Sequence, residues 1–453
     1  MSVLDRARVT LDATMPMGVR GRVSTLRGST LLVRGLPMPV GSVVRVRSSL
    51  AGGGEQLGEI VGLADGCSIV MLMGGGEGIR AGDVVEGLQA GASIAVGPGL
   101  LGRVIDAMGR PLDSKPAARE HSWAPLDALR VGPMSREPIS TPLRTGVRSI
   151  DLITPIGRGQ RMGIFAGPGV GKSTLLGQIT RQTDADVVVV ALLGERGREV
   201  REFIEDALGE QGLARSVVVC ATADEPPLVR SRAARAACAI AEHFRDHGMS
   251  VLLVMDSLTR YAHALRQIGL AAGEPPTSRG YTPGVFANMA TLLERAGAVE
   301  LGGGRVGSIT GLYTVLVEGD DFNEPVSDAV RGVLDGHVLL SRDLATRGHY
   351  PAVDVLGSVS RLATRLMDPE HTRARTQVVR LLAAYAKSED LVRIGAYAKG
   401  SSKEVDAAIE LMPRIESILQ QAVDDDTGFD EARQRLVMLA SEISARLGEG
   451  VKA

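Results

Sequence analysis

A glycine-rich segment in the first half of the chain, "FAGPGVGKSTLLGQ" (165–178), has the residue types of a phosphate-binding loop. In such a loop, backbone N–H groups and the positive end of the next helix bind phosphate oxygens, and glycines permit the tight turns. We expect Lys172 to reach the β- and γ-phosphates of a nucleotide, and Ser173 to offer its hydroxyl to Mg²⁺. The other residues expected around the phosphates are Gly167, Pro168, Gly169, Val170, Gly171 and Thr174.

Ala166 stands where the strict pattern G-x-x-x-x-G-K-[ST] requires glycine. Its place at the end of an apolar run, before the turn, predicts that a methyl group fits there if φ stays negative. The alternative is a glycine-rich strand-to-helix turn with a surface lysine. A strand pattern before the loop and a helix pattern after it favour phosphate binding.

Two acidic residues follow strand-like apolar runs. Asp256 ends "LLVMD", and Glu195 follows "VVVVALLG". In open α/β sheets, ligands bind at the carboxyl ends of the strands, so both carboxylates are expected near the loop. Asp256 would then support the Mg²⁺ shell, and Glu195 would orient the attacking water. Taken alone, an Asp after an apolar strand, such as Asp256, is more often a helix cap or turn residue. From composition alone, Glu195 could equally be part of a solvated charge cluster.

The elements that would position these residues follow from the apolar pattern. From about residue 161, short apolar runs alternate with helix-like stretches, which predicts an α/β domain with a mostly parallel sheet. Short Val- and Ile-rich runs from about 20 to 93 predict a small β-barrel or sandwich, and the region beyond 370 shows helical spacing. We therefore predict an N-terminal β-barrel over 1–93, a P-loop domain over 94–370 and a C-terminal helical domain over 371–453.

Composition narrows the class of protein. The formal net charge of −2 gives no reason to expect a polyanion as the main partner. The three cysteines, Cys67, Cys220 and Cys238, are too widely spaced for a disulfide framework or a zinc site. No signal-peptide pattern opens the chain and no apolar run approaches the ~18 residues of a membrane span, which predicts a cytoplasmic protein.

Several long segments together resemble a known family. They include "TGVRSIDLITPIGRGQRMGIFAGPGVGKS", "LLGERGREV", "VMDSLTRYAHALRQIGLAAGEPP", "GYTPGVFANMATLLERAG" and "RGHYPAVDVLGSVSR". In this order they resemble the catalytic, β-type subunit of the rotary ATPase superfamily, and most of all the homohexameric ATPases of flagellar and type III protein export. The resemblance implies a RecA-like P-loop core and Mg²⁺-dependent ATP hydrolysis. The family commonly has a residue other than glycine at the position of Ala166.

The resemblance also assigns roles that the residues alone leave open. It makes Glu195 the catalytic glutamate, with Arg196 and Glu199 around the γ-phosphate and the water shell of the metal. It makes Asp256 the Walker B aspartate, with Ser173 and Glu199 as the other metal-site residues. The remaining implied roles are γ-phosphate sensing by Arg260, a finger donated to the neighbouring subunit by Arg361, adenine packing by Tyr350 and nucleotide binding by Gln421. Without the resemblance, Arg260 and Arg361 are ordinary surface arginines and Tyr350 a half-buried tyrosine. Ile418 departs from the family, which often has an aromatic residue on the adenine side.

The implied partners are the other subunits of a homohexamer, a stalk or regulator protein, and export substrates or chaperones beside a membrane-embedded export gate. We expect the barrel to act in assembly and docking, at the cytoplasmic face of the inner membrane. A hexameric RNA helicase is disfavoured because the first aromatic residue is Trp123 and residues 1–95 hold 9 Arg against 8 acidic residues. A non-catalytic subunit is disfavoured by Glu195. The alternative is the catalytic subunit of a membrane-bound rotary ATP synthase or ion pump, but the absence of an acidic "DELSEED"-type segment fits an export ATPase better. A flagellar role is preferred over a virulence-type one.

Overall fold

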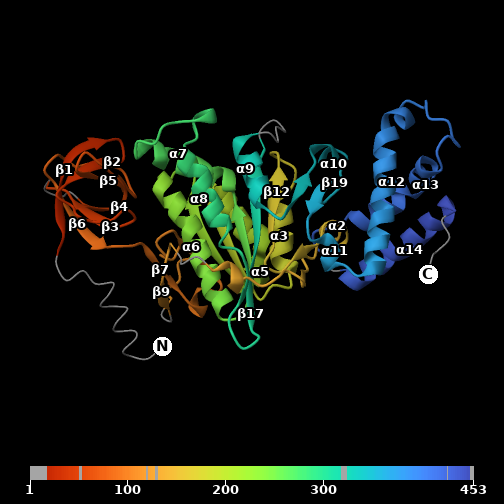
Figure 1. Cartoon of the computed structure of the whole chain (residues 1–453), viewed down its shortest axis with the longest axis horizontal. Coiled ribbons are helices and arrows are strands. Elements are labelled where there is room, and N and C mark those ends of the chain that lie inside the picture. Colours follow the sequence, from red (N-terminus) through yellow and green to blue (C-terminus); the bar gives the residue numbers. More distant parts are fainter. Residues whose placement is uncertain are drawn as a thin grey trace.

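The computed structural model describes residues 18–49, 54–118, 121–127, 131–317, 324–425 and 427–448. Three parts follow one another along its long axis: a β-barrel, a central sheet flanked by helices, and a group of C-terminal helices (Figure 1). This is the predicted fold class, and it is confirmed. The first 17 residues, which belong to the predicted assembly region, lie outside the described residues.

The N-terminal part is a closed six-stranded barrel with strand order β1-β2-β5-β4-β3-β6. Alternate residues point inward, as Leu31 and Val33 of β2 do, and both are fully buried. The Val- and Ile-rich runs therefore form a barrel and not a sandwich. Its strands are β1 (Arg20–Arg27), β2 (Thr30–Arg34), β3 (Val43–Arg47), β4 (Glu55–Ala64), β5 (Cys67–Leu72) and β6 (Val84–Gln89).

The central sheet has the order β19-β18-β12-β17-β15-β13-β14-β8, with β16 paired to β17. Neighbouring strands from β18 to β8 run parallel, whereas β19 and β16 are antiparallel to their partners. The strands are β8 (Arg103–Asp106), β12 (Arg161–Ala166), β13 (Val187–Glu195), β14 (Ser216–Thr222), β15 (Ser250–Asp256), β16 (Gly297–Glu300), β17 (Val306–Leu316), β18 (Gly336–Leu340) and β19 (Val353–Ser360).

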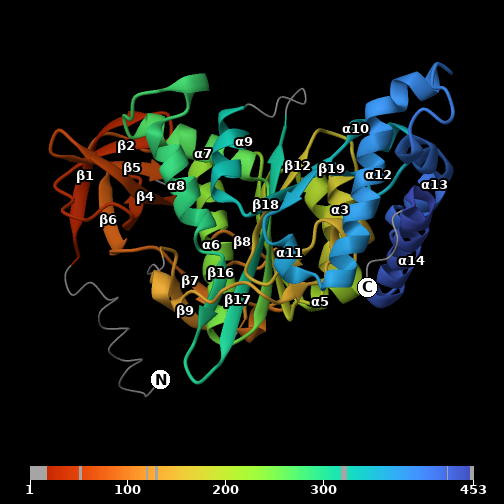
Figure 2. The ribbon, with the colours of Figure 1, turned by 45° about the vertical axis from the view of Figure 1, so that its right-hand side comes forward.

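Continuous apolar strands arise because both faces of this sheet are covered. In β13, Val189 and Ala191 belong to the core on one face, and Val188 and Val190 to the core on the other. Helices α6, α7, α8 and α9 lie on the first face and α3 on the second (Figure 2). These helices are α3 (Lys172–Gln182), α6 (Pro227–Asp246), α7 (Leu258–Ala271), α8 (Pro283–Leu293) and α9 (Pro325–Val333).

Helices α12 (Pro369–Arg393), α13 (Lys403–Leu419) and α14 (Phe429–Leu447) form the C-terminal part and pack on the second face of the sheet through α2 (Arg148–Ile153). The remaining elements are short. They are β7 (Ser93–Val96), β9 (Ser122–Pro125), β10 (Pro142–Leu143), β11 (Ile156–Gly157), α4 (Gly197–Glu202), a π-helix (Phe203–Leu208), α5 (Gly209–Ala214), α10 (Arg342–Thr346), α11 (Ala363–Leu366) and 3₁₀ turns at Pro98–Leu100, Pro133–Ser135 and Ser278–Gly280.

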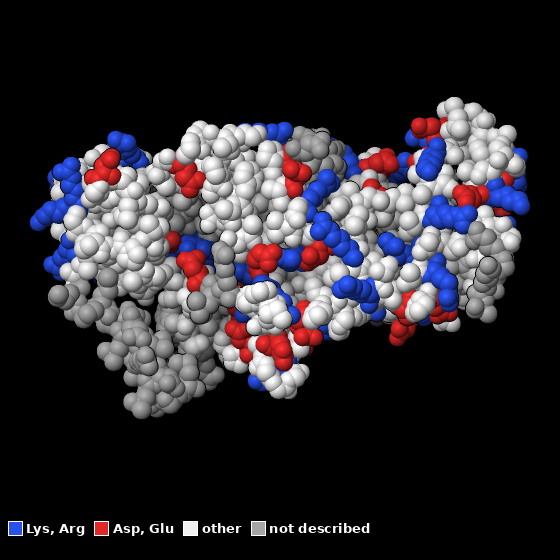
Figure 3. All heavy atoms as spheres, viewed as in Figure 1, with Lys and Arg blue, Asp and Glu red and all other residues white. Residues whose placement is uncertain are grey.

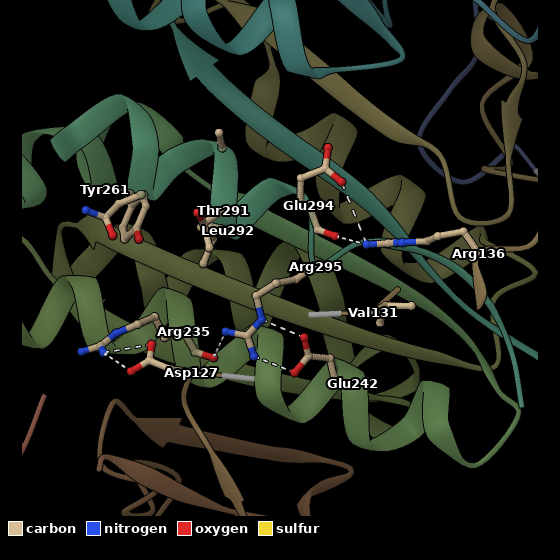
Figure 4. A pocket seen from close by; sticks show the side chains of 12 residues that line it. Asp127, Val131, Arg136, Arg235, Glu242, Tyr261, Thr291, Leu292, Glu294 and Arg295 are labelled. Atoms are coloured by element: carbon tan, nitrogen blue, oxygen red, sulfur yellow. Dashed lines mark hydrogen bonds and ion pairs between the residues drawn. The ribbon is translucent and has the colours of Figure 1, made fainter. Parts of the chain in front are cut away.

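A largely buried ion pair connects the barrel to the central part. Arg235 of α6 donates to Glu59 of β4 at 3.0 and 3.1 Å and also pairs with Asp127 at 3.4 Å. Further along α6, Glu242 forms a two-bond pair with Arg295 at 2.6 and 2.7 Å. Figure 4 shows Arg235, Asp127, Glu242 and Arg295 among the side chains that line a cavity of about 420 Å³. The barrel is thus fixed to the helix whose first turn lies at the carboxyl edge of the sheet.

On the face of the molecule seen in Figure 3, neither sign of charge forms a single continuous patch. Acidic and basic side chains are interspersed over the face seen in Figure 3, in keeping with the net charge of −2. In the part of the chain that the structure describes, no helix has the length and apolar character needed to cross a membrane.

Candidate nucleotide-hydrolysis site

The glycine-rich loop connects the buried strand β12 to α3, as its sequence predicts. Gly169 and Gly171 have φ of 77° and 85°, conformations that favour glycine. Ala166 is buried within β12 and is not among the described residues with positive φ, so its methyl group is accommodated as expected. Ser173 and Thr174 are exposed in the first turn of α3, and no described side chain caps that turn. The free N–H groups of this helix end suit a phosphate.

Lys172 lies between two carboxylates. Its ammonium group contacts Asp256 Oδ1 directly and is 3.9 Å from Glu195 Oε1. Asp256 is buried at the end of β15, and Thr314 of β17 donates a 2.6 Å hydrogen bond to the same Oδ1 atom. Because β13, β15 and β12 all end at one edge of the sheet, residues 84 positions apart in sequence meet there. Thr314 was missed at the sequence level, because only strand register reveals it.

Glu195, at the same edge of the sheet, has a strongly raised pKa. Burial raises the pKa of Glu195 to about 7, the nearby Asp256 charge adds to the rise, and Lys172 opposes it. Arg260, in the first turn of α7, lies 3.8 Å from Glu195 Oε2. A carboxyl group with this pKa, held by two flanking cations, has the properties of a group that positions a water and accepts its proton.

Arg196 and Glu199 begin α4 immediately after Glu195. Arg196 is largely exposed, its backbone N–H donates to Glu199 Oε2 at 3.4 Å, and its guanidinium donates to Oε1 at 3.3 Å. A hydrogen bond from Glu195 lowers the pKa of Glu199. The structure thus brings Glu199 to Glu195, whereas Arg196 points outward from the same turn.

Tyr350 and Gln421 have different surroundings. The ring of Tyr350 is half exposed and lies beside Gly171, 3.4 Å from where a β-carbon would stand on that glycine. Gln421 is buried, and its amide accepts from Arg148 N and donates to Gly146 O, both at 2.9 Å. Gln421 therefore joins the C-terminal helices to residues 146–148 in this conformation, while its backbone N–H donates to Tyr350 O at 2.9 Å.

Arg361 is not near these residues within its own chain. It follows β19, is exposed, and its backbone N–H donates to Asp335 O at 3.0 Å. Ser360 pairs with Gly336 at the start of β18, whereas Leu340 at the other end of β18 pairs with Ala166. Arg361 therefore lies at the amino edge of the sheet, opposite the phosphate-binding loop.

Comparison with known proteins places this site in a family. Residues 146–360 match the model described as "ATP synthase alpha/beta family, nucleotide-binding domain", and residues 367–438 match "T3SS EscN ATPase C-terminal domain". The flagellum-specific ATP synthase of Pseudomonas aeruginosa is 48% identical over 422 residues, which are 93% of each chain. The type 3 secretion system ATPase of Xanthomonas euvesicatoria is 46% identical over 431 residues, 95% of this chain and 96% of its own.

The chain belongs to the family of flagellum-specific and type III secretion ATPases. A solved structure agrees: the assembled ATPase EscN in complex with its central stalk EscO, from the type III secretion system of enteropathogenic E. coli, matches with a TM-score of 0.84. Identity to it is 39%, over 93% of this chain and 100% of that one. The predicted family and ATPase activity are confirmed. Because identities of 48% and 46% do not separate the two branches, the flagellar assignment stays a prediction.

Proposed function

We propose that this ATPase works as a homohexamer whose ATP turnover energises protein export through a flagellar or related type III apparatus. The observation that carries the proposal is the meeting of Lys172, Glu195, Asp256 and Arg260 at one sheet edge beside the glycine-rich loop. This arrangement supplies a phosphate-binding cation, a water-orienting carboxylate, a metal-site carboxylate and a second cation.

Lys172 and Glu195 have separable tasks in this proposal. The Lys172 ammonium, which contacts Asp256 here, would bind nucleotide phosphate as a charge-assisted donor. Glu195 would hold the attacking water by its carboxylate and take up its proton. Burial raises the pKa of Glu195, which brings its proton affinity nearer to neutral pH and makes it a better base.

The residues at this edge fit Mg²⁺. Among the described residues no group of three or more His, Cys, Asp or Glu side chains is placed to hold a metal by itself. An exposed Ser173 hydroxyl and the Asp256 carboxylate nevertheless supply the oxygen donors that Mg²⁺ prefers, and this ion usually shares its shell with substrate phosphates and water. When bound, the ion neutralises charge on the phosphate oxygens. Glu199, whose carboxylate accepts a hydrogen bond from Arg196, would contribute to the water shell of the ion.

Assembly would complete the site. Arg361 is exposed and lies at the sheet edge opposite to its own loop, which suits a finger supplied to a neighbouring subunit. The structure of the related EscN is that of the assembled ATPase with its central stalk, which supports a ring with a stalk protein here.

We further propose that residues 1–93 serve assembly and docking. Residues 94–370 would form the motor domain and residues 371–453 the helical domain. Export substrates or chaperones would bind at the cytoplasmic face of the inner membrane. Nucleic acid is not a proposed partner.

Two substitutions test the proposed division of tasks. Glu195→Gln is expected to keep ATP affinity while lowering turnover by about 10²–10⁴, because it preserves shape but removes the charge. Lys172→Ala is expected to weaken ATP binding itself. Glu202→Gln, on an exposed residue of α4 paired with Arg198, makes the same chemical change away from the site and serves as the control. Fluorescent-ATP titration and phosphate release distinguish the variants, and near-normal turnover of Glu195→Gln would refute the assignment.

Specific activity should also rise with protein concentration in step with the particle mass seen by light scattering, because interface sites exist only in the assembled ring. Full activity in a monomer would contradict the proposed assembly.

A further inference from the structure

A second arginine, Arg230, lies beside Arg260 at the edge of the active site. Arg230 is in the first turn of α6, and Arg260 is in the first turn of α7. Both helices begin at the carboxyl edge of the sheet, where Ala223 N donates to Glu195 O at 3.0 Å just before α6. The aliphatic parts (stems) of both arginine side chains pack against the same residue, Gly194.

Gly194 immediately precedes Glu195 and has φ of 71°, which favours glycine. A β-carbon at this residue would stand 2.9 Å from Arg260 Cδ and 3.5 Å from Arg230 Cδ. The missing side chain thus leaves room for both arginine stems, side by side, against the backbone that carries Glu195. Any shift of one stem changes the space available to the other.

The two guanidinium groups have different partners. Arg260 lies 3.8 Å from Glu195 Oε2, whereas Arg230 donates to Gln267 Oε1 of α7 at 3.2 Å. Within the described part of the chain, neither Nε atom finds an acceptor although both are buried. Burial and the neighbouring charge of Arg260 lower the pKa of Arg230, while Glu225 opposes this effect. Like charges repel, so Arg230 favours positions of Arg260 that are turned toward Glu195.

We propose that Arg230 is a positioning residue that confines Arg260 to the Glu195 side of Gly194 and so keeps its guanidinium ready for the γ-phosphate. This inference rests on the proposed function, because it takes Arg260 to act on the nucleotide. The inference adds Arg230 as a residue that affects turnover by positioning Arg260. Gln267 is the anchor that fixes Arg230, since its carboxamide oxygen accepts the hydrogen bond.

The alternative is that Arg230 only joins α6 to α7 and stabilises the fold. A double-mutant cycle separates the two roles, because residues that act as a unit show non-additive effects. The variants are Arg230→Ala, Arg230→Lys, Arg260→Ala and the double Arg230→Ala/Arg260→Ala. Turnover, KM for ATP and thermal midpoint are measured on the assembled full-length enzyme. Arg201→Ala, at an exposed arginine of α4, is the matched control.

Arg230→Ala is expected to lower kcat about tenfold with KM for ATP changed less than about twofold, since the group that is displaced acts in the transition state. Arg230→Lys keeps a stem and a charge and should recover most of the loss. In the Arg260→Ala background, adding Arg230→Ala should change kcat less than about twofold. Gln267→Ala should lower kcat in the same direction as Arg230→Ala, by less.

Additive losses in the cycle, or a fall in thermal midpoint that accounts for the lost activity, would overturn the inference. Unchanged kcat in Arg230→Ala would do the same. The proposed function fails in a different way: if Arg260→Ala alone turns over at the normal rate, Arg260 is not the γ-phosphate residue, whatever Arg230 does. The two failures are therefore distinguishable within one set of proteins.

Discussion

The position of Arg361 predicts that two inactive variants will restore activity when they share one ring. Arg361 follows Ser360, which pairs with Gly336 at the start of β18. The phosphate-binding loop follows Ala166, which pairs with Leu340 at the end of β18. The four-residue separation between Gly336 and Leu340 corresponds to about 13 Å along the strand. The exposed Arg361 side chain starts at the far edge of the sheet, so it cannot act at the loop of its own subunit.

The expected losses follow from the charge that develops on the γ-phosphoryl oxygens. An arginine finger contributes about 10³–10⁵ in rate, or roughly 4–7 kcal/mol. Arg361→Ala should therefore assemble and bind ATP but turn over very slowly, and Glu195→Gln should do the same for a different reason. In a random equimolar ring, about a quarter of the interfaces join an intact Glu195 to an intact Arg361 from the next subunit. Turnover should rise far above that of either variant alone.

The assay uses two differently tagged variants, mixed as dissociated subunits, reassembled, and purified through both tags before phosphate release is measured. Arg365→Ala, at an exposed arginine of α11, is the control and should keep normal turnover. Mixed rings verified by both tags that show no recovery would refute the reasoning. In that case Arg361 would act within its own subunit or only support the fold.

Local sequence patterns are enough to predict that Lys172, Glu195 and Asp256 come together at one edge of the sheet, as the structure has them. Strand runs that end in Glu195 and Asp256, and a glycine-rich turn before α3, lead to one sheet edge as soon as the strands are parallel. The closed barrel was one of two architectures consistent with its short apolar runs. Strand pairing between distant segments decides that choice, and no local pattern specifies it.

Residues whose partners come from distant segments were not predictable. Thr314 reaches Asp256 only through the register of β15 and β17. Gln421 was predicted to bind nucleotide, but its amide bonds to residues 146–148 depend on how the C-terminal helices pack against α2. No sequence pattern indicates a role for Arg230, because an arginine in the first turn of a helix is usually a surface residue.

Three further predictions concern stability. Glu59→Ala should lower the free energy of unfolding by about 3–5 kcal/mol in denaturant titration, because it leaves Arg235 buried without its main partner; a loss below 1 kcal/mol would show that the barrel junction is held by packing. Burial would raise the pKa of Asp113, but hydrogen bonds from Arg103 and nearby backbone outweigh it and hold the pKa at about 2. Since the folded pKa lies below the ordinary value of 3.8, about 2 kcal/mol of stability should be present above pH 4 and lost as pH falls from about 4 to about 2, and Asp113→Asn should abolish this dependence. Gln421→Ala should lower stability by about 1–3 kcal/mol, because it leaves the buried Arg148 N–H and Gly146 carbonyl unpaired. If Gln421 serves packing in this way, ATP affinity at temperatures well below the unfolding transition should stay within about twofold of normal; a tenfold loss of affinity with unchanged stability would instead assign Gln421 to the nucleotide.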